Sequence, residues 1–367
     1  MENAFEIMKL YFKDFEKPNI ESPSDAWIKT FKKRHSLKEV RSIPLEDERS
    51  KMGTSANISW WFTEIYEKID LTKYANGMIG NADETMLSSK GRLKCIIPKD
   101  QRQAIIKGKQ DKEHVTILTM VTNTADYSPP LFIFPLKNTP KELTDMVLAG
   151  KIIIAGQESG WIDTSIFGTW CDCIIKWIQV RRTMLGLSKE APFLMFVDSH
   201  SSRAVSETLM KFKENFIDIM TFPSHCSHLL QSLDVGIFGP FKKYLKVWRR
   251  NLTRTQIKWT NNSIVSEKSE GRVKLVLTAI NALHQSMTYT LVERGFRLSG
   301  IWPRDENQTL ENPRIIENDE VTMKNTKRKR LPSNGGLITS DSIIQLVEEG
   351  EKETKKKKQT KKCDFLY

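Results

Sequence analysis

Three aspartates, each at the end of a predicted element, are the residues of this 367-residue chain best suited to chemistry. Asp83 follows a short apolar stretch at 77–79, Asp198 follows the apolar run 193–197, and Asp234 lies just before a helix. Hard divalent cations bind carboxylate oxygens. Two such cations, about 4 Å apart, accelerate phosphodiester cleavage by activating the attacking oxygen and stabilising the leaving one. The three aspartates therefore predict a site for Mg²⁺ or Mn²⁺, with two ions, that cuts DNA.

Simpler interpretations compete for the same residues. A single aspartate at a strand end is commonly a turn or capping residue, so only the joint pattern of three favours a metal site. A zinc site would need His225, Cys226 and His228 together with Cys171 and Cys173 elsewhere, and the spacing of these residues matches no common zinc module. The serines beside His200 lack the Gly-x-Ser-x-Gly elbow of serine hydrolases. We therefore interpret His225 and His228 as supporting residues that pack or hydrogen-bond within the turn and help to position Asp234.

The elements predicted around the aspartates alternate between strands and helices. The strongest strand is 193–197, whose uninterrupted apolar run is typical of a strand buried on both faces. Runs of β-branched and aromatic residues predict further strands at 114–121, 131–134 and 217–222, and apolar residues spaced by three and four predict a helix over 164–180. Together they predict an α/β fold, a mixed sheet covered by helices. In such sheets ligand-binding groups collect where strands end.

The helix predicted after Asp234 has two faces. Its apolar residues repeat at three and four positions from Phe238 to Leu252 and are expected to face the core. Its basic residues are Lys242, Lys243, Lys246, Arg249 and Arg250. They leave two interpretations open, a solvated surface or a surface that contacts DNA phosphates. The same two interpretations apply to a shorter helix that Ser24 can cap. Its basic residues are Lys32, Lys33 and Arg34.

Composition favours an acidic partner inside the cell. The net charge is +12 and the pI is near 9.3, which is typical of proteins that bind nucleic acid. Five cysteines without disulfide-framework spacing indicate a reducing compartment, and we find neither a signal-peptide core nor an apolar run long enough for a membrane helix. The basic clusters 327–330 and 355–358 are typical of nuclear import signals. We expect a soluble nuclear protein that binds DNA, and leave open whether it forms a homo-oligomer.

Four further expectations concern the remaining segments. A helix is predicted over 56–69, the helix after Asp234 is expected to continue to about residue 259, and another helix is predicted over 273–291. From about residue 305 polar and charged residues dominate. The composition of this tail is too polar to build a core, so we expect it to be disordered.

At the three aspartates the sequence resembles the DDE-superfamily endonuclease domain of pogo-like transposases, in the mariner superfamily. This group includes the tigger, jerky and centromere-protein-B relatives. The matching blocks are 81–85 (NADET), 159–162 (SGWI), 196–202 (FVDSHSS), 223–240 around Asp234, and 296–303 (FRLSGIWP). The block at 223–240 is highly specific, and the others are moderately so. Met86 and Ser232 replace a glycine and a proline of the family pattern, and neither change removes a metal ligand.

The resemblance implies a ribonuclease H-like fold and a catalytic, metal-binding triad of Asp83, Asp198 and Asp234. The implied reaction is hydrolytic nicking at transposon ends, followed by attack of the freed 3′-hydroxyl on target DNA. The resemblance also divides the chain into a remnant of a helix-turn-helix DNA-binding region (1–53), a DDE endonuclease domain (54–303) and a basic tail (304–367). Only residues 27–35 resemble the two helix-turn-helix units with which the family begins. The alternative function is therefore a domesticated, catalytically silent nuclear DNA-binding protein.

Overall fold

A computed structural model of the chain provides the structure. It describes residues 24–37, 46–87, 106–107, 115–139, 141–200, 203, 205–254, 257–260, 263–266, 272–322 and 331–363, with the backbone alone at 106–107, 142, 250–254, 257–260, 263–266 and 355–363. The chain divides into two compact units, 1–46 and 47–367, and each is described by itself.

The described part of the first unit contains helix α2 (Asp25–Arg34), as predicted. Its amino terminus is capped by Ser24, whose Oγ accepts a hydrogen bond from the backbone N–H of Trp27 at 3.3 Å. Trp27 stacks on Phe31 one turn later, with ring centroids 4.9 Å apart. Of the predicted basic residues, Lys33 and Arg34 are exposed and Lys32 is half-buried.

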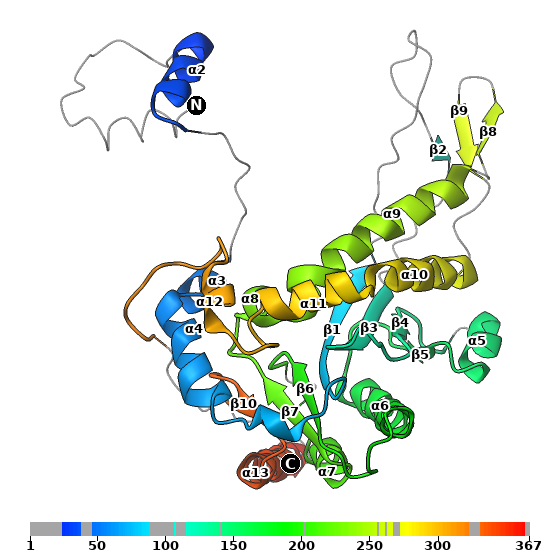
Figure 1. Cartoon of the computed structure of the whole chain (residues 1–367). Helices are drawn as coiled ribbons and strands as arrows, with labels where there is room; N and C mark the ends of the chain where they lie inside the picture. The colour runs from blue at the N-terminus through cyan, green and yellow to red at the C-terminus, as the bar shows by residue number, and fades with distance from the viewer. Residues whose placement is uncertain are drawn as a thin grey trace. The chain divides into compact units, whose positions relative to one another are not determined.

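The second unit is built on a seven-stranded mixed sheet with the order β10-β7-β6-β1-β3-β4-β5 (Figure 1). Its strands are β1 (Ile79–Leu87), β3 (Val115–Thr122), β4 (Leu131–Phe134), β5 (Ile153–Gly156), β6 (Phe193–Val197), β7 (Ile217–Thr221) and β10 (Gly336–Leu337). Strand β3 is antiparallel to both β1 and β4, whereas β6 runs parallel to β1 and to β7. Numbered along the chain, the five central strands lie in the order 3-2-1-4-5, which is the arrangement of a ribonuclease H-like sheet. The predicted fold class is confirmed.

Helices cover both faces of this sheet and close two separate cores (Figure 1). One face carries α6 (Thr164–Met184), α7 (Ser206–Glu214) and α13 (Asp341–Cys363). The other face carries α4 (Ser55–Trp61), α9 (Phe238–Arg254), α10 (Arg272–Ser286) and α11 (Tyr289–Leu298). Met195 and Val197 of β6 belong to the α6 core, and Leu194 and Phe196 belong to the α9 core. Because strand side chains alternate, every second residue of β1 and β6 faces α9.

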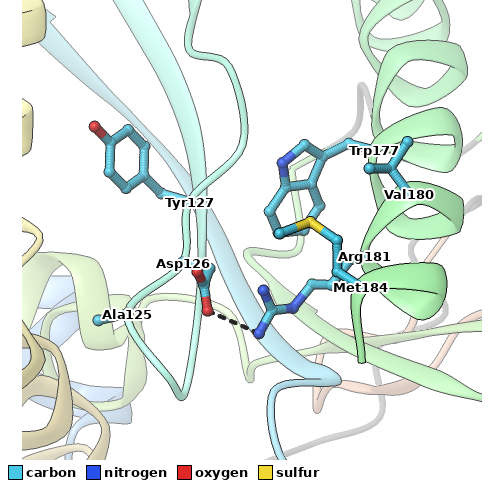
Figure 2. Close-up of a pocket in the computed structure, with 7 residues that line it drawn as sticks. All are labelled: Ala125, Asp126, Tyr127, Trp177, Val180, Arg181 and Met184. Atoms are coloured by element: carbon cyan, nitrogen blue, oxygen red, sulfur yellow. Dashed lines mark ion pairs between the residues drawn. The ribbon is translucent and has the colours of Figure 1, made fainter. Parts of the chain in front are cut away.

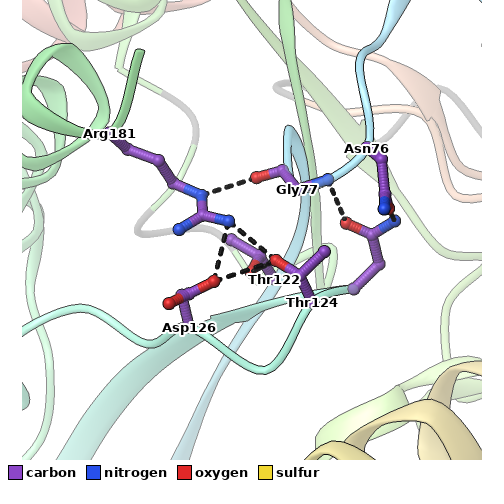
Figure 3. Close-up of polar contacts among 7 residues, drawn as sticks. Asn76, Gly77, Thr122, Thr124, Asp126 and Arg181 are labelled. Atoms are coloured by element: carbon purple, nitrogen blue, oxygen red, sulfur yellow. Dashed lines mark hydrogen bonds and ion pairs between the residues drawn. The ribbon is translucent and has the colours of Figure 1, made fainter. Parts of the chain in front are cut away.

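The buried Arg181 of α6 fixes the start of β1 (Figure 3). Its Nε donates to the carbonyl oxygen of Gly77 at 2.7 Å, and its Nη2 donates to Thr124 Oγ1 at 2.7 Å. The same Nη2 pairs with Asp126 Oδ2 at 2.8 Å. Gly77 has a φ of +86°, and a Cβ there would lie 2.5 Å from Arg181 Nη2, so only glycine fits. Arg181 thereby ties α6 to the beginning of β1 and to the turn after β3.

Two predicted helices have different bounds in the structure. The helix predicted over 56–69 is α4 followed by a π-helical turn, η1 (Phe62–Tyr66). The extra residue in this turn changes the inward face. Ile58, Trp61, Phe62 and Tyr66 are buried, whereas Trp60, Ile65 and Ile69 only pack at its margin. The helix predicted over 273–291 is two helices, α10 and α11, and Thr288 in extended conformation begins the second one.

The helix after Asp234 is shorter than predicted. It ends at Arg254 and is followed by strand β8 (Ile257–Thr260), so the expectation of helix to about residue 259 is wrong. Strands β8, β9 (Ser263–Ser266) and β2 (Ile106–Lys107) form a separate three-stranded sheet in the order β2-β9-β8. Shorter helices complete the second unit: α3 (Asp47–Met52), η2 (Leu71–Lys73), η3 (Lys141–Leu143), α5 (Thr144–Leu148), α8 (Ser227–Leu230) and α12 (Glu306–Leu310).

The expectation of a disordered tail is wrong wherever the structure describes the tail. Residues 316–318 hydrogen-bond to the start of α4, with Ser55 N–H donating to Ile316 O at 3.0 Å and Ala56 N–H donating to Asn318 O at 3.1 Å. Further on, β10 adds to the edge of the main sheet beside β7. The tail buries Leu331, Ile338, Ile344 and Val347 in the α6 core. The basic cluster 327–330 lies outside the described residues, and 355–358 are part of α13.

Candidate active site: the acidic cluster

Asp83 and Asp198 lie at matching positions of neighbouring parallel strands. The pairs from Ile79↔Leu194 to Asn81↔Phe196 define the register of β1 and β6, and two residues further this register sets Asp83 beside Asp198. Neighbouring strands lie about 4.8 Å apart. Asp83 is only 8% exposed, whereas the side chain of Asp198 is 30% exposed.

The position of Asp83 within its strand differs from the prediction. It does not end a strand, because β1 continues to Leu87 and stays paired with β3 over that length. Strand β6, in contrast, ends at Val197, directly before Asp198. Beyond Asp83, β1 therefore has no described pairing with β6, and the carboxylates lie where the sheet opens on that side.

A bridge of buried side-chain amides brings Asp234 to this pair. The Oδ1 of Asn81 accepts from the backbone N–H of Leu233 at 3.0 Å, and its Nδ2 donates to Gln231 Oε1 at 2.7 Å. Gln231 Nε2 in turn donates to the carbonyl oxygen of Ala82 at 3.0 Å. These bonds flank Asp83 on one side and, on the other, Asp234 in the π-helical turn η5 (Leu233–Ile237). Three aspartates from three segments of the chain thus lie in one region of the fold.

The electrostatics of the cluster reflect this convergence. Burial is the main reason why the pKa of Asp83 lies well above its ordinary value, and the charges of Asp234, Glu84 and Asp198 raise that pKa further. Asp234 reaches solvent, but surrounding protein atoms still raise its pKa by desolvation, and Asp198 adds to the effect. The cations Lys242, Arg49 and Arg314 oppose it. Burial, more than the neighbouring charges, therefore disfavours the ionised forms of Asp83 and Asp234.

The buried Arg203 lies against this cluster from the α6 face. Its side chain is 1% exposed, and its Nη2 pairs with Glu84 Oε2 at 2.5 Å and with Asp198 Oδ1 at 3.0 Å. The guanidinium also lies over the ring of Phe167, with 5.0 Å from Cζ to the ring centroid. Burial alone would lower the pKa of Arg203, but Glu84 and Asp198 outweigh burial and raise it. Arg203 and Glu84 were not among the predicted site residues, although both lie in or next to blocks of the family pattern.

The cluster fits a divalent cation in charge and in donor type. Carboxylate oxygens are the ligands that Mg²⁺ and Mn²⁺ prefer, and burial together with the neighbouring carboxylates raises the pKa of Asp83. Within the residues that the structure describes, no three His, Cys, Asp or Glu side chains stand close enough together to hold a metal ion as they are. Asp198, one of the three aspartates, is paired with Arg203.

Basic side chains lie on the Asp234 side of the cluster. Lys242 of α9 is exposed and was predicted, whereas the half-buried Arg49 of α3 and the exposed Arg314 were missed. No pattern in the sequence marks the latter two. Their segments meet through backbone hydrogen bonds, among them the one that Ile316 N–H donates to Gly53 O at 3.1 Å.

The other predicted DNA-binding residues of α9 have varied surroundings. Lys243 and Lys246 are exposed beside Lys242, and Arg249 is half-buried. The backbone of Arg250 is part of α9, but its side chain is outside the description. On the opposite face of the helix, Phe238, Phe241 and Leu245 are buried, as predicted. Lys32, Lys33 and Arg34 belong to the other unit, so the structure does not relate them to the aspartates.

The two histidines near Asp234 lie in the turn that precedes it. His228 is 5% exposed, and its Cε1 would lie 3.4 Å from a Cβ on Gly53. Burial, with Arg49 and Arg314, lowers its pKa to about 4. His225 is half-buried and has a φ of +64°. Cys226 belongs to the α9 core and Cys171 to the α6 core, so the sheet separates the cysteines that a zinc site would need.

A shallow hollow of about 230 Å³ lies elsewhere on the second unit (Figure 2). It is lined by Ala125, Asp126, Tyr127, Trp177, Val180, Arg181 and Met184. Arg181 and Asp126 fix the beginning of β1, whereas Asp83 lies in its second half. The hollow is therefore separate from the acidic cluster and offers no carboxylate set for a metal.

A comparison with the sequence profiles of known families shows to which family the chain belongs. The profile of the DDE superfamily endonuclease family matches residues 111–296, which include Asp198 and Asp234. The chain belongs to this family. Asp83 lies before the matched segment, and its place in the site rests on the strand register and on the amide bridge.

One individual relative of this DDE-family chain matches over a limited stretch. A stretch of 134 residues is 26% identical to the "MFS-type transporter clz9" of Cochliobolus lunatus, covering 36% of this chain and 14% of that protein. Among the described helices, none combines the length and the apolar character needed to cross a membrane.

Two solved structures of a transposase are also similar. A Mos1 transposase paired-end complex with the left transposon end has a TM-score of 0.44 and 8% identity, over 86% of this chain and 87% of that one. A Mos1 mariner paired-end complex with Mn has a TM-score of 0.44 and 9% identity, over 85% of this chain and 87% of that one. Similarity at this level does not support a residue-by-residue comparison.

Proposed function

We propose that the chain is a metal-dependent DNA endonuclease and strand transferase of the pogo-like transposase type. The observation that carries the proposal is the convergence of Asp83, Asp198 and Asp234 from three segments of a DDE-family chain. Buried like charges destabilise a fold unless a cation offsets them, so packing alone gives no reason for this set. Perturbed carboxylates at the edge of a sheet are typical of functional sites.

The three aspartates would hold Mg²⁺ or Mn²⁺, as two ions. When bound, the ions supply the positive charge that activates the attacking oxygen and stabilises the leaving oxygen of the scissile phosphodiester. The chain itself holds the metal ligands and the DNA in position. The amide bridge from Asn81 to Gln231 and Leu233 holds Asp234 beside Asp83, and Lys242, Arg49 and Arg314 place positive charge where a DNA phosphate would lie.

The test is nicking of supercoiled plasmid DNA by the purified full chain in Mg²⁺ or Mn²⁺. We expect open-circular product, which chelation by EDTA and the substitution Asp198→Ala both abolish. Asp172→Ala is the matched control, because Asp172 is an exposed carboxylate of α6 outside the cluster. Equal nicking by Asp198→Ala and the unmodified chain would overturn the proposal.

DNA contact by the basic face of α9 is a separate part of the proposal. Each lysine that neutralises a phosphate contributes about 0.9 to the slope of log K against log salt concentration. The double substitution Lys242→Ala/Lys246→Ala should therefore flatten this slope by roughly 2 and weaken binding to any DNA sequence. Lys141→Ala/Lys151→Ala removes two exposed lysines away from α9 and should leave the slope unchanged.

One observation favours the alternative, a catalytically silent nuclear DNA-binding protein. The ion pair between Arg203 and Asp198 engages a proposed metal ligand. Calorimetric titration with Mn²⁺ distinguishes the two functions. The endonuclease requires saturable binding that Asp198→Ala weakens, whereas the silent protein would show DNA binding without metal binding.

A nuclear location belongs to the same proposal. It rests on the basic clusters 327–330 and 355–358. A fluorescent reporter fused to residues 324–367 should enter the nucleus, and alanine at all eight cluster positions should keep it in the cytoplasm. A cytoplasmic reporter with the clusters intact would contradict this.

A further inference from the structure

The guanidinium of Arg203 has two acidic partners, and it contacts them differently. With Glu84 Oε2 its Nη2 makes a hydrogen bond of 2.5 Å. With Asp198 Oδ1 the same nitrogen makes an ion pair at 3.0 Å, and that oxygen is buried without a hydrogen bond of acceptable geometry. Of the two carboxylates, Asp198 is therefore the one that Arg203 can release more easily.

We propose that Arg203 is an internal counter-ion that holds Asp198 out of the metal-binding arrangement until a divalent cation competes for it. Glu84 keeps the guanidinium in place after Asp198 has left. Arg203 is thus a positioning residue, and it makes metal binding weaker than the three aspartates alone would give. The inference rests on the proposed function, because it assumes that Asp198 is a metal ligand.

Strand geometry shows why Asp198 would leave Arg203 in order to bind a metal ion together with Asp83. Asp83 faces α9, since it has the same parity on β1 as Ile79, which belongs to the α9 core. Glu84, the next residue, faces α6, and there it meets Arg203 over Phe167. Asp198 directly follows β6, where the register places it beside Asp83, and its Oδ1 is paired with Arg203, which lies over Phe167 of α6. Turning its carboxylate towards Asp83 would complete the set of three aspartates.

The surroundings of Arg203 do not depend on Asp198. The side chain is almost completely buried, it is hydrogen-bonded to Glu84, and it covers the Phe167 ring. If Asp198 leaves, the charge of Arg203 still has Glu84 as its buried partner. A buried cation that lost its last partner would be strongly destabilising, and Glu84 prevents this.

The experiment compares Mn²⁺ affinity, measured by calorimetry on the full chain, for charge-matched variants. Arg203→Met/Glu84→Gln removes one positive and one negative charge and frees Asp198. We expect its Kd for Mn²⁺ to fall at least tenfold below that of the unmodified chain. Lys211→Met/Asp172→Asn also removes an ion pair, one at 3.3 Å and partly exposed, and should leave the Kd unchanged. Circular dichroism confirms that each variant is folded.

A crystal structure of the unmodified chain with Mn²⁺ provides a second measurement, which does not require a variant to fold. The contact between Arg203 Nη2 and Asp198 Oδ1 should open from 3.0 Å, while the contact with Glu84 remains. Mn²⁺ bound with both contacts intact would overturn the inference, as would an unchanged or higher Kd in Arg203→Met/Glu84→Gln. If neither the unmodified chain nor that variant binds Mn²⁺, the proposed function itself is wrong.

Discussion

Asn81 on β1 and Gln231 in the loop before Asp234 are joined by a hydrogen bond of 2.7 Å between two completely buried side chains, 150 positions apart in the chain. Together with the bonds to Leu233 and Ala82, it is the only described polar bridge between β1 and that loop. It therefore couples the stability of the fold to the position of Asp234.

The substitution Asn81→Leu should be costly, because it leaves the Leu233 N–H and Gln231 Oε1 buried without these partners. Each such group costs about 1–3 kcal/mol, so the free energy of unfolding should fall by roughly 2–5 kcal/mol. Urea denaturation measures the change, and Asn307→Leu, at an exposed position of α12, is the matched control. An Asn81→Leu protein as stable as this control would show that the bridge does not stabilise the fold.

Two glycines near Asp234 should respond oppositely to alanine. A Cβ on Gly236, in the same π-helical turn as Asp234, would lie 2.5 Å from the Cα of Gly295 in α11. Backbone must move to accept it, so Gly236→Ala should lower the free energy of unfolding by about 1–3 kcal/mol and should weaken Mn²⁺ binding by displacing Asp234. Gly239 is exposed in α9 and has no atom within 4 Å of such a Cβ. Gly239→Ala should stabilise by about 0.5–1 kcal/mol.

Thermal unfolding of the two variants side by side, with and without Mn²⁺, measures both effects. If Gly236→Ala unfolded at the same temperature as the unmodified chain and bound Mn²⁺ equally well, the close approach of η5 and α11 would not position Asp234.

Asp83→Asn should stabilise the protein when metal is removed. The pKa of Asp83 is higher in the fold than in the unfolded chain, so the fold binds the proton more tightly, and stability is lost as pH rises above about 3.9 towards the folded pKa. In EDTA at pH 8 the variant should therefore melt at a higher temperature than the unmodified chain. Excess Mn²⁺ should reverse the order, since the variant lacks a ligand. Asp172→Asn is the control, and a lower melting temperature for Asp83→Asn in EDTA would contradict the prediction.

Sequence patterns predicted the elements of the sheet because their signals are local. The run 193–197 is buried on both faces as its apolar residues require, and Ser24 caps α2 as its side-chain oxygen allows. Asp83 was assigned to a strand end because the change from apolar to polar residues occurs there. Strand β1 continues to Leu87 because β3 pairs with it, and that pairing joins residues 28 to 42 positions apart.

The residues around the aspartates were harder to predict, since their roles depend on contacts between distant segments. Arg203 lies five residues after Asp198, but its pairing with Glu84 spans 119 positions. Arg314 lies in a segment whose composition suggested disorder, and hydrogen bonds from α4 to residues 316–318 place that segment. Average polarity describes such a segment poorly, because a few backbone bonds and buried side chains are enough to order it.

His228 should make stability depend on pH between about 4 and 6.5. Burial keeps this histidine neutral in the fold, with a pKa of about 4, whereas the unfolded chain accepts the proton near pH 6.5. The contribution of His228 to the free energy of unfolding is fully present above pH 6.5 and is lost as pH falls towards 4. This loss amounts to about 2 kcal/mol between pH 7 and pH 5. His228→Leu should lose that much less stability over this interval than the unmodified chain. His284→Gln, at an exposed position of α10, should behave like the unmodified chain in urea denaturation at the two pH values.

The carboxyl-terminal segment should be required for folding of the second unit. Residues 331–347 bury Leu331, Ile338, Ile344 and Val347, and burying each such side chain is worth about 1.5–3 kcal/mol. Ile338 N–H also donates to Ile219 O at 2.9 Å, so β10 covers the edge of β7. A chain that ends at residue 330 should therefore unfold at a lower urea concentration and aggregate through the uncovered strand edge.

A chain that ends at residue 354 is the matched control for this truncation, because it keeps β10 and the buried residues of α13. It also keeps Glu351, whose carboxylate accepts hydrogen bonds from the backbone N–H and the Oγ of Ser206, at 3.2 and 2.9 Å. These bonds hold the first residue of α7, three positions after Arg203. Glu351→Gln should therefore cost about 0.5–2 kcal/mol by weakening charge-assisted bonds. Equal urea midpoints for the chains that end at 330 and 354 would show that β10 and α13 do not stabilise the sheet.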